Sequence, residues 1–397
     1  MKHLVIAGGG FAGFWSAMSA VRQAVALGQR DSLKITLINR DEYLGLRPRF
    51  YEACLVGTRI PLRNWLTPLG IDLVISEIAS IIPTSRRIRF VNGPDSPPDI
   101  SYDRLILATG SHQTYPDSVG PGRVFSVDTF AESAALDQHL RALARADFPT
   151  PASRTFVVVG GGLTGLEIAT ALPARLKDLA PSTAGLTFHL IEQAPEIGLG
   201  YTPDARQHIA RRLRDLGIAA HTGHKVLRHE YGRLILADNQ QLATETVIVA
   251  TGLMASPLTG AFQGHRDMLG RLTVDAFLRL PGHPEVLAAG DVSLAKTDPD
   301  HYAVMSCQHA MPQGRVAGHN AVSLLFGGNP VAYAQPRYRT CLDLGPGDGL
   351  VTAGWERSLK TIGPEAKAIK TEIVSQWICP PDDIATTLAM AAPAITA

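Results

Sequence analysis

The sequence predicts an α/β fold in which one type of domain occurs twice. The apolar run Leu4 to Ala7 predicts a buried parallel strand, and a G-x-G-x-x-G turn and a helix over Phe14 to Leu27 follow it. The same strand, glycine-rich turn and helix pattern returns at 157–165. An apolar strand ending in Ala-Thr-Gly also occurs twice in the same relative order, at 102–111 and 246–252. Chance glycines would not repeat two elements in order, so we predict a duplicated domain.

Each glycine-rich turn has the spacing of a dinucleotide-binding site. In the first turn, Gly8 permits the tight bend, Gly10 lets the backbone approach a diphosphate, and Gly13 lets the helix pack close to the strand. One such turn is weak evidence by itself, but two suggest two dinucleotides and electron transfer between them. The predicted contacts in the turns are Gly8, Gly10, Phe11, Ala12, Gly13, Gly160, Gly162, Leu163, Thr164 and Gly165.

We therefore predict two Rossmann-like dinucleotide-binding domains, with the second inserted into the first, plus a small C-terminal α+β region. The first domain is assigned to 1–115 and 253–325, and the second to 116–252. The strand at 284–291 returns the chain to the first domain. The C-terminal interface region covers 326–397, with short strands over 340–355.

Composition excludes several classes of function. A net charge of +1 gives no electrostatic case for nucleic acid. The four cysteines (Cys54, Cys307, Cys341 and Cys379) are widely spaced, which argues against a disulfide scaffold, a zinc site and a dithiol centre and favours buried inert thiols. No apolar run approaches the roughly 18–20 residues of a membrane span, and the first strand begins at once, so we expect a cytoplasmic protein without a signal peptide.

Several residues of the first domain follow its predicted strands, where a cofactor would bind. Strand 33–38 ends at Asn39 and Arg40, where such folds usually have an acid that binds ribose hydroxyls, a role an amide can also fill. Segment 47–52 is either a surface loop that leads into a helix or a wall of the pocket. The further contacts assigned to this domain are Arg47, Pro48, Ala79, Ala108, Thr109, Gly110, Gly290 and Asp291.

Two of these assignments depend on secondary structure. Asp291 follows a glycine at a strand end and can accept hydrogen bonds from a ribityl chain, although a turn or helix cap is the alternative. Ala79 lies in 73–91, whose alternating apolar residues predict a small antiparallel insert with a turn at 92–94.

In the second domain, two acidic residues and the end of one strand are candidates for contacts with the dinucleotide. Glu167 is placed in the first turn of the second glycine-loop helix, and is either a helix-start acid or a nicotinamide contact. Glu192 ends strand 186–191, where it can bind the adenosine ribose and repel a 2′-phosphate. Thr251 and Gly252 repeat the Ala-Thr-Gly contact. The arginines of helix 204–216 are predicted to lie on a solvent-exposed face of that helix and not in a phosphate site.

The remaining predicted helices cover 126–146, a segment starting near Ser306, and 366–377. Ile384 to Ala397 is apolar but has no basic face, so it either packs or frays and is a poor interfacial segment.

The glycine-rich turns, the Ala-Thr-Gly strands and the Gly-Asp strand end, taken in this order, resemble the two-dinucleotide flavoprotein superfamily of disulfide reductases, ferredoxin reductases and type II NADH dehydrogenases. Segments 37–43 and 47–53 look like the type II NADH dehydrogenase pattern, Trp377 to Pro381 is similar to that family's C-terminal signature, and 308–314 resembles its quinone-site helix. The resemblance implies FAD in the first domain, NADH in the second, and a quinone or other small molecule as acceptor. It also implies roles for Gln308 and Ala310 beside the flavin.

Three features depart from that family. Asn39 replaces the usual acid, Cys307 and Pro312 replace an Ala and a Gln of the quinone-site pattern, and the membrane-anchoring C-terminal helices are much reduced. The protein is therefore expected to be cytoplasmic, with peripheral contact at the inner face of the membrane as the alternative. Whether it forms a homodimer stays open.

The leading functional hypothesis is an NADH dehydrogenase with Glu167, Gln308 and His309 as catalytic residues. Gln308 would hydrogen-bond a quinone carbonyl and His309 would donate a proton, although a plain polar helix residue is equally compatible with His309. The alternatives are a dithiol oxidoreductase or sulfide:quinone reductase, which need paired cysteines, a ferredoxin-type reductase, which needs a basic docking patch, and a redox sensor that turns over slowly.

Overall fold

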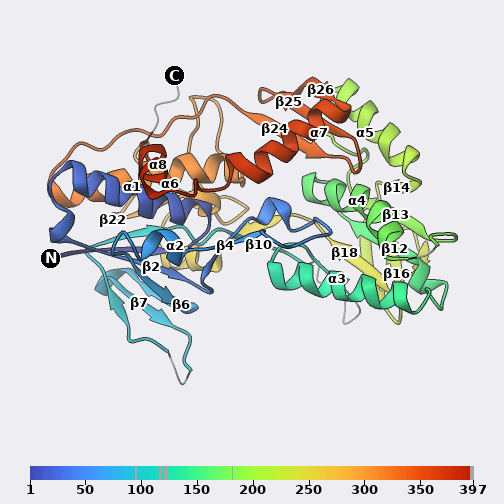
Figure 1. The fold of residues 1–397 in the computed structure, drawn as a ribbon, viewed down its shortest axis with the longest axis horizontal. Coiled ribbons are helices and arrows are strands. Elements are labelled where there is room, and N and C mark those ends of the chain that lie inside the picture. The colour runs from blue at the N-terminus through green and yellow to red at the C-terminus, as the bar shows by residue number, and fades with distance from the viewer. Residues whose placement is uncertain (94–95, 116–118, 120–123, 181, 394–397) are drawn as a thin grey trace.

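A mostly parallel sheet, a fully parallel sheet and a C-terminal cap form an elongated molecule in the computed structural model, which describes residues 1–93, 96–115, 119, 124–180 and 182–393 (Figure 1). The first sheet has the order β21-β22-β9-β1-β2-β5. Its strands are β1 (Lys2–Ala7), β2 (Leu33–Asn39), β5 (Asp72–Ile75), β9 (Arg104–Leu107), β21 (Arg279–Leu280) and β22 (His283–Ala288). Strands from both ends of the first 290 residues thus share one sheet.

The first sheet is covered on both faces, as near-continuous apolar parallel strands require. Leu4 and Ile6 pack into the core under the helices α1 (Phe11–Ala26) and α6 (Cys307–Phe326). Val5 and Ala7 pack against the opposite core, to which the small antiparallel sheet of β6 (Ile78–Ile82), β7 (Arg87–Phe90) and β8 (Ile100–Ser101) contributes.

Helices α1 and α6 lie side by side because two glycines of α6 let the backbones meet (Figure 1). A Cβ at Gly314 would lie 2.3 Å from the Ala12 carbonyl oxygen, and one at Gly318 would lie 2.2 Å from that of Ser16. The four-residue spacing of the glycines puts both on one helix face. This packing brings the starts of α1 and α6 together.

The second sheet, of order β11-β18-β12-β13-β14, is parallel throughout. Its strands are β11 (Val124–Phe125), β12 (Thr155–Val159), β13 (Thr187–Glu192), β14 (Ile218–Thr222) and β18 (Thr246–Val249). The helices on one side are α3 (Phe130–Arg145), α4 (Leu163–Leu179) and α5 (Pro203–Asp215), and the antiparallel sheet on the other consists of β15 (Val226–Glu230), β16 (Arg233–Leu236) and β17 (Gln241–Ala243).

Two crossing strands, β10 (Ser111–Gln113) and β19 (Leu253–Ala255), pair antiparallel where the chain passes between the two sheets. We propose to keep the predicted division at 115/116 and 252/253, although residues 116–118 lie outside the described residues. The end of the last predicted segment, 394–397, and part of the predicted turn at 92–94 also lie outside them.

The C-terminal region caps the second domain and then returns to the first (Figure 1). It contains β24 (Arg339–Asp343), β25 (Gly349–Ala353), β26 (Ser358–Ile362), α7 (Gly363–Glu372), a π-helical turn (Ile373–Trp377) and α8 (Ile384–Met390). Trp65 Nε1 donates to the Pro381 carbonyl oxygen at 3.2 Å, which ties the return segment to the first domain.

The structure corrects three details of the sequence prediction. Both glycine-loop helices begin earlier than predicted, at Phe11 and Leu163, so each third glycine is helical. Strand β5 pairs parallel with β2 instead of joining the antiparallel insert. The arginine helix α5 is not fully solvated, because Arg212 donates to the Leu344 carbonyl oxygen at 2.8 Å. Among the described residues, no helix combines the length and apolar character needed to cross a bilayer.

Candidate active site

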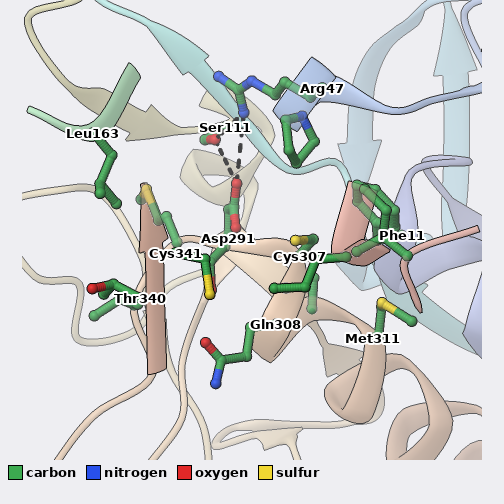
Figure 2. A pocket seen from close by; sticks show the side chains of 18 of the residues that line it. Phe11, Arg47, Ser111, Leu163, Asp291, Cys307, Gln308, Met311, Thr340 and Cys341 are labelled. Atoms are coloured by element: carbon green, nitrogen blue, oxygen red, sulfur yellow. Dashed lines mark hydrogen bonds and ion pairs between the residues drawn. The ribbon is translucent and has the colours of Figure 1, made fainter. Parts of the chain in front are cut away.

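A cavity of about 1010 Å³ lies where the two domains and the C-terminal region meet (Figure 2). Its wall includes the starts of three helices: residues 10–12 of the first glycine-rich turn and α1, residues 163–164 of α4, and residues 306–308 around the start of α6. Helix N-termini carry unpaired N–H groups and a partial positive charge, so this arrangement favours anionic ligands.

The glycines of the first glycine-rich turn have two different roles: two allow close packing of the backbone, and one faces the cavity. A Cβ on Gly8 would lie 2.2 Å from the Ala108 carbonyl oxygen, and one on Gly13 would lie 1.7 Å from that of Gly8. A Cβ on Gly10 would meet no atom within 4 Å, and Gly10 lines the cavity. Gly10 thus leaves room for a diphosphate, and the site fits a dinucleotide.

The second turn repeats this arrangement. A Cβ on Gly160 would lie 2.3 Å from the Ala250 carbonyl oxygen, and one on Gly165 would lie 1.8 Å from that of Gly160. Gly162 is exposed, and a Cβ there would meet nothing within 4 Å. The second turn therefore also fits a dinucleotide.

Asn39 and Glu192 occupy equivalent places at the ends of β2 and β13. Asn39 Oδ1 accepts the Gly9 N–H at 2.9 Å, and Glu192 Oε2 accepts the Gly161 N–H at 2.6 Å. The Asn39 amide also donates to the Asp41 and Tyr43 carbonyl oxygens at 3.0 and 3.1 Å. A carboxylate at position 39 could not donate to these two carbonyl oxygens, whereas the amide can. The accepting oxygens of Asn39 and Glu192 each keep a lone pair for a ribose hydroxyl.

A charged cluster surrounds Asp291 (Figure 2). Ser111 Oγ donates to Asp291 Oδ2 at 2.6 Å, and Arg47 Nη1 lies 3.7 Å from the same oxygen. Arg47 also pairs with Asp128. Burial raises the pKa of Asp291, while the Ser111 hydrogen bond and the Arg47 charge act in the opposite direction. Arg47 therefore belongs to the cavity wall rather than to a free surface loop.

Glu167 is a buried wall residue and not a first-turn acid. Because α4 begins at Leu163, Glu167 lies beyond the first turn, and only 6% of it is exposed. Lys370 Nζ, on α7, donates to Glu167 Oε1 at 2.7 Å, and the Asp343 N–H donates to the same oxygen at 3.2 Å. The predicted helix-dipole explanation is thus wrong, and an ion pair replaces it.

The Glu167–Lys370 pair belongs to a larger buried network. Burial raises the pKa of Glu167, which Lys370 offsets only in part. Burial alone would lower the pKa of Lys370, but the Glu167 carboxylate raises it overall. Asp343 continues the network by accepting from Tyr51 Oη at 2.7 Å and from Lys367 Nζ at 2.6 Å. The C-terminal region is thereby fastened to α4 at the cavity wall.

At the start of α6, Gln308 lines the cavity but His309 does not. His309 is 1% exposed, its Nδ1 lies 2.9 Å from Ser306 Oγ, and its ring lies 5.8 Å from that of Tyr338. Burial lowers the pKa of His309 to about 4. A buried, neutral imidazole away from the cavity is poorly suited to the predicted proton donation.

Two of the four cysteines, Cys307 and Cys341, line the cavity from α6 and β24 (Figure 2). Burial raises the pKa of Cys307 to about 11 and also raises that of Cys341. Since the thiolate is the reactive form, the raised pKa of each thiol argues against the dithiol alternatives.

The cavity gathers many of the predicted site residues but not all. Those that line it are Gly10, Phe11, Ala12, Arg47, Pro48, Ala108, Gly110, Leu163, Thr164, Glu167, Gly290, Asp291, Gln308 and Ala310. Those outside its lining are Gly8, Gly13, Asn39, Arg40, Ala79, Thr109, Gly160, Gly162, Gly165, Glu192, Thr251, Gly252 and His309. Ala79 is exposed on β6. The binding roles assigned to these residues outside the lining stay predictions.

Sequence reasoning missed Lys370, Ser111, Asp128 and the arginines of the C-terminal wall. Lys370 looks like an ordinary helical lysine in sequence, and the partner that makes it a wall residue lies 203 positions away. Ser111 directly follows the predicted Ala-Thr-Gly contact, which was a usable signal.

The chain is similar to known redox proteins over its whole length. A family model described as pyridine nucleotide-disulphide oxidoreductase matches residues 2–314. The NADH dehydrogenase-like protein Rv1812c of Mycobacterium tuberculosis is 40% identical over 404 residues, covering 100% of this chain and 99% of that protein.

More distant proteins match most of the chain in sequence or in fold. The type II NADH:quinone oxidoreductase of Staphylococcus haemolyticus is 22% identical over 369 residues, covering 88% of this chain and 89% of that protein. The structure of NDH2 from Plasmodium falciparum in complex with NADH has a TM-score of 0.78 at 14% identity, covering 98% of this chain and 97% of that chain.

Proposed function

Because the chain belongs to the pyridine nucleotide-disulphide oxidoreductase family, we propose that it passes electrons from NADH through FAD to a quinone. It is an NADH dehydrogenase-like oxidoreductase, and its cofactors are FAD and NADH. The observation that carries the proposal is that the starts of α1, α4 and α6 all line one and the same cavity.

When bound, NADH supplies a hydride and FAD passes the two electrons on. Residues 10–12 would hold the FAD diphosphate, and Asp291, oriented by Ser111 and Arg47, would accept hydrogen bonds from the ribityl chain. Thr164 and Leu163 would meet the NADH diphosphate, and Glu167 would lie on the nicotinamide side. Gln308 would bind the acceptor.

The test is anaerobic reduction of the purified protein by NADH, followed at the flavin absorbance bands, and then reoxidation by a panel of quinones. Fast reduction with reoxidation by at least one quinone is expected. Reduction without reoxidation by any quinone would favour the ferredoxin-type or sensor alternatives. A membrane-resident quinone would further require the alternative localisation, peripheral contact at the inner face of the membrane. A homodimer stays the other open alternative.

Gln308→Ala should slow the quinone half-reaction alone. The backbone carbonyl of Gln308 already accepts from Gln335 Nε2 at 3.1 Å, so the helix start should survive loss of the Gln308 side chain. One hydrogen bond to the quinone is worth about 0.5–1.5 kcal/mol, so reoxidation should slow about two- to tenfold. Stopped-flow measurement of both half-reactions checks this. A slower NADH half-reaction with unchanged reoxidation would assign Gln308 to the flavin instead.

Glu192 should set the preference for NADH over NADPH. Its oxygens already accept from the Gly161 and Ala194 N–H groups, so the carboxylate is fixed where a 2′-phosphate would approach. Glu192→Gln combined with Gln193→Arg should reduce the NADH:NADPH ratio of kcat/KM about tenfold or more, since one such contact is worth roughly 1–3 kcal/mol. The control is Gln193→Arg alone, and a wild type that uses NADPH better would contradict the assignment.

A further inference from the structure

The cavity wall carries more positive charge than its acids can neutralise. Its charged lining consists of Arg47, Arg337, Arg339, Arg357, Lys370, Asp128, Glu167 and Asp291. Arg47 pairs with both aspartates and Lys370 with Glu167, which uses all three acids. The other three arginines form no ion pair within 4.0 Å in the part of the chain that the structure describes.

Of these three arginines, only Arg357 forms a side-chain hydrogen bond or cation–π contact among the described residues. Arg357 lies over the Tyr201 ring of the second domain at 4.9 Å and also donates to Tyr338 Oη at 3.4 Å. Arg337 and Arg339 flank Tyr338, whose ring lies 5.8 Å from that of His309 in the first turn of α6. Arg339 also precedes Thr340 and Cys341, which share the cavity with Gln308 (Figure 2).

The cofactor diphosphates do not account for Arg337 and Arg339. The starts of α1 and α4 offer backbone N–H groups and room at Gly10 and Gly162 for these two groups. Arg337 and Arg339 are exposed, and they line the same cavity as Gln308, the residue proposed to bind the acceptor. Two free guanidinium groups next to the acceptor site would attract and orient an anion.

We propose that the physiological acceptor is a small anionic molecule, such as a quinone bearing a carboxylate, sulfonate or phosphate, which Arg337 and Arg339 bind by its charge. The inference rests on the proposed function. A small molecule fits better than a protein surface because both arginines line the cavity together with Gln308.

The experiment compares 1,4-naphthoquinone with 1,4-naphthoquinone-2-sulfonate as acceptors for the FAD-loaded wild type and the double variant Arg337→Gln/Arg339→Gln. The KM for the sulfonate should rise about tenfold or more, because charge-assisted hydrogen bonds are lost, while the KM for the neutral quinone should stay within about twofold. Added salt should raise the wild-type KM for the sulfonate only. Arg87→Gln, which removes an exposed arginine from β7, is the matched control and should change neither KM.

Equal changes for both quinones would overturn the inference. So would a lower FAD content or a higher KM for NADH in the double variant, because the arginines would then hold a cofactor. Reduction of the neutral quinone with no effect of charge or salt would overturn the inference but leave the proposed function intact. A wild type that NADH reduces but neither quinone reoxidises would overturn both.

Discussion

Gly10→Val is expected to give a folded protein that purifies without flavin. Gly10 has φ −72° and ψ −167°, which any residue adopts, and a Cβ there meets no protein atom within 4 Å. The added side chain would instead occupy the space assigned to the FAD diphosphate. Losing two backbone hydrogen bonds to a charged group, at about 1.5–3 kcal/mol each, would weaken FAD binding at least about a hundredfold. Flavin absorbance per protein after purification measures the result.

Gly162→Val is the matched control, because Gly162 has nearly the same backbone angles, φ −73° and ψ −174°, and the same open surroundings. It should retain FAD but no longer be reduced by NADH at low concentration. Together, the two variants thus test the assignment of one cofactor to each glycine-rich turn. A fully flavin-loaded Gly10→Val protein, or loss of flavin from Gly162→Val, would reverse or refute that assignment.

Circular dichroism and thermal melting of both variants separate a binding defect from a folding defect. By contrast, a Cβ on Gly13 would lie 1.7 Å from the Gly8 carbonyl oxygen, so Gly13→Ala should damage the fold itself. Conserved secondary structure in Gly10→Val and its loss in Gly13→Ala would support the different roles of the two glycines.

The repeated elements made the fold predictable from sequence. A buried strand, a glycine-rich turn and a helix follow one another without a break from Lys2 to Ala26 and again from Thr155 to Leu179, so the local sequence is sufficient to predict each copy. The helix starts were misplaced because the third glycine of each turn was taken as a helix boundary, whereas Gly13 and Gly165 lie inside α1 and α4. Their role is close packing, which sequence spacing alone does not separate from helix termination.

The site was only partly predictable because its wall is built from distant segments. Glu167 was singled out from its place after the second turn, but its partner Lys370 comes from a helix 203 residues later. His309 was placed at the cavity by its proximity to Gln308, yet adjacent helical residues point in different directions, and His309 points into the protein. Such errors arise where tertiary packing, not local pattern, decides which side chain faces the ligand.

Lys370→Met should lower the free energy of unfolding by about 3–5 kcal/mol, because it leaves Glu167 buried without its counter-ion. Lys370 Nζ is the only side-chain donor to the Glu167 carboxylate among the described residues, and both side chains are less than 10% exposed. The pair also joins α4 to α7 at the cavity wall, so the C-terminal region should detach more easily. The denaturant midpoint of the FAD-loaded protein measures the loss.

The double variant Glu167→Gln/Lys370→Met separates the charge from the packing. Glutamine keeps an oxygen for the Asp343 N–H, which Glu167 Oε1 accepts at 3.2 Å, and it removes the unpaired charge. Because replacing both members of a buried pair often costs little, the double variant should recover most of the stability lost in Lys370→Met. If both variants were equally destabilised, the aliphatic stem of Lys370, and not the uncompensated carboxylate, would account for the effect.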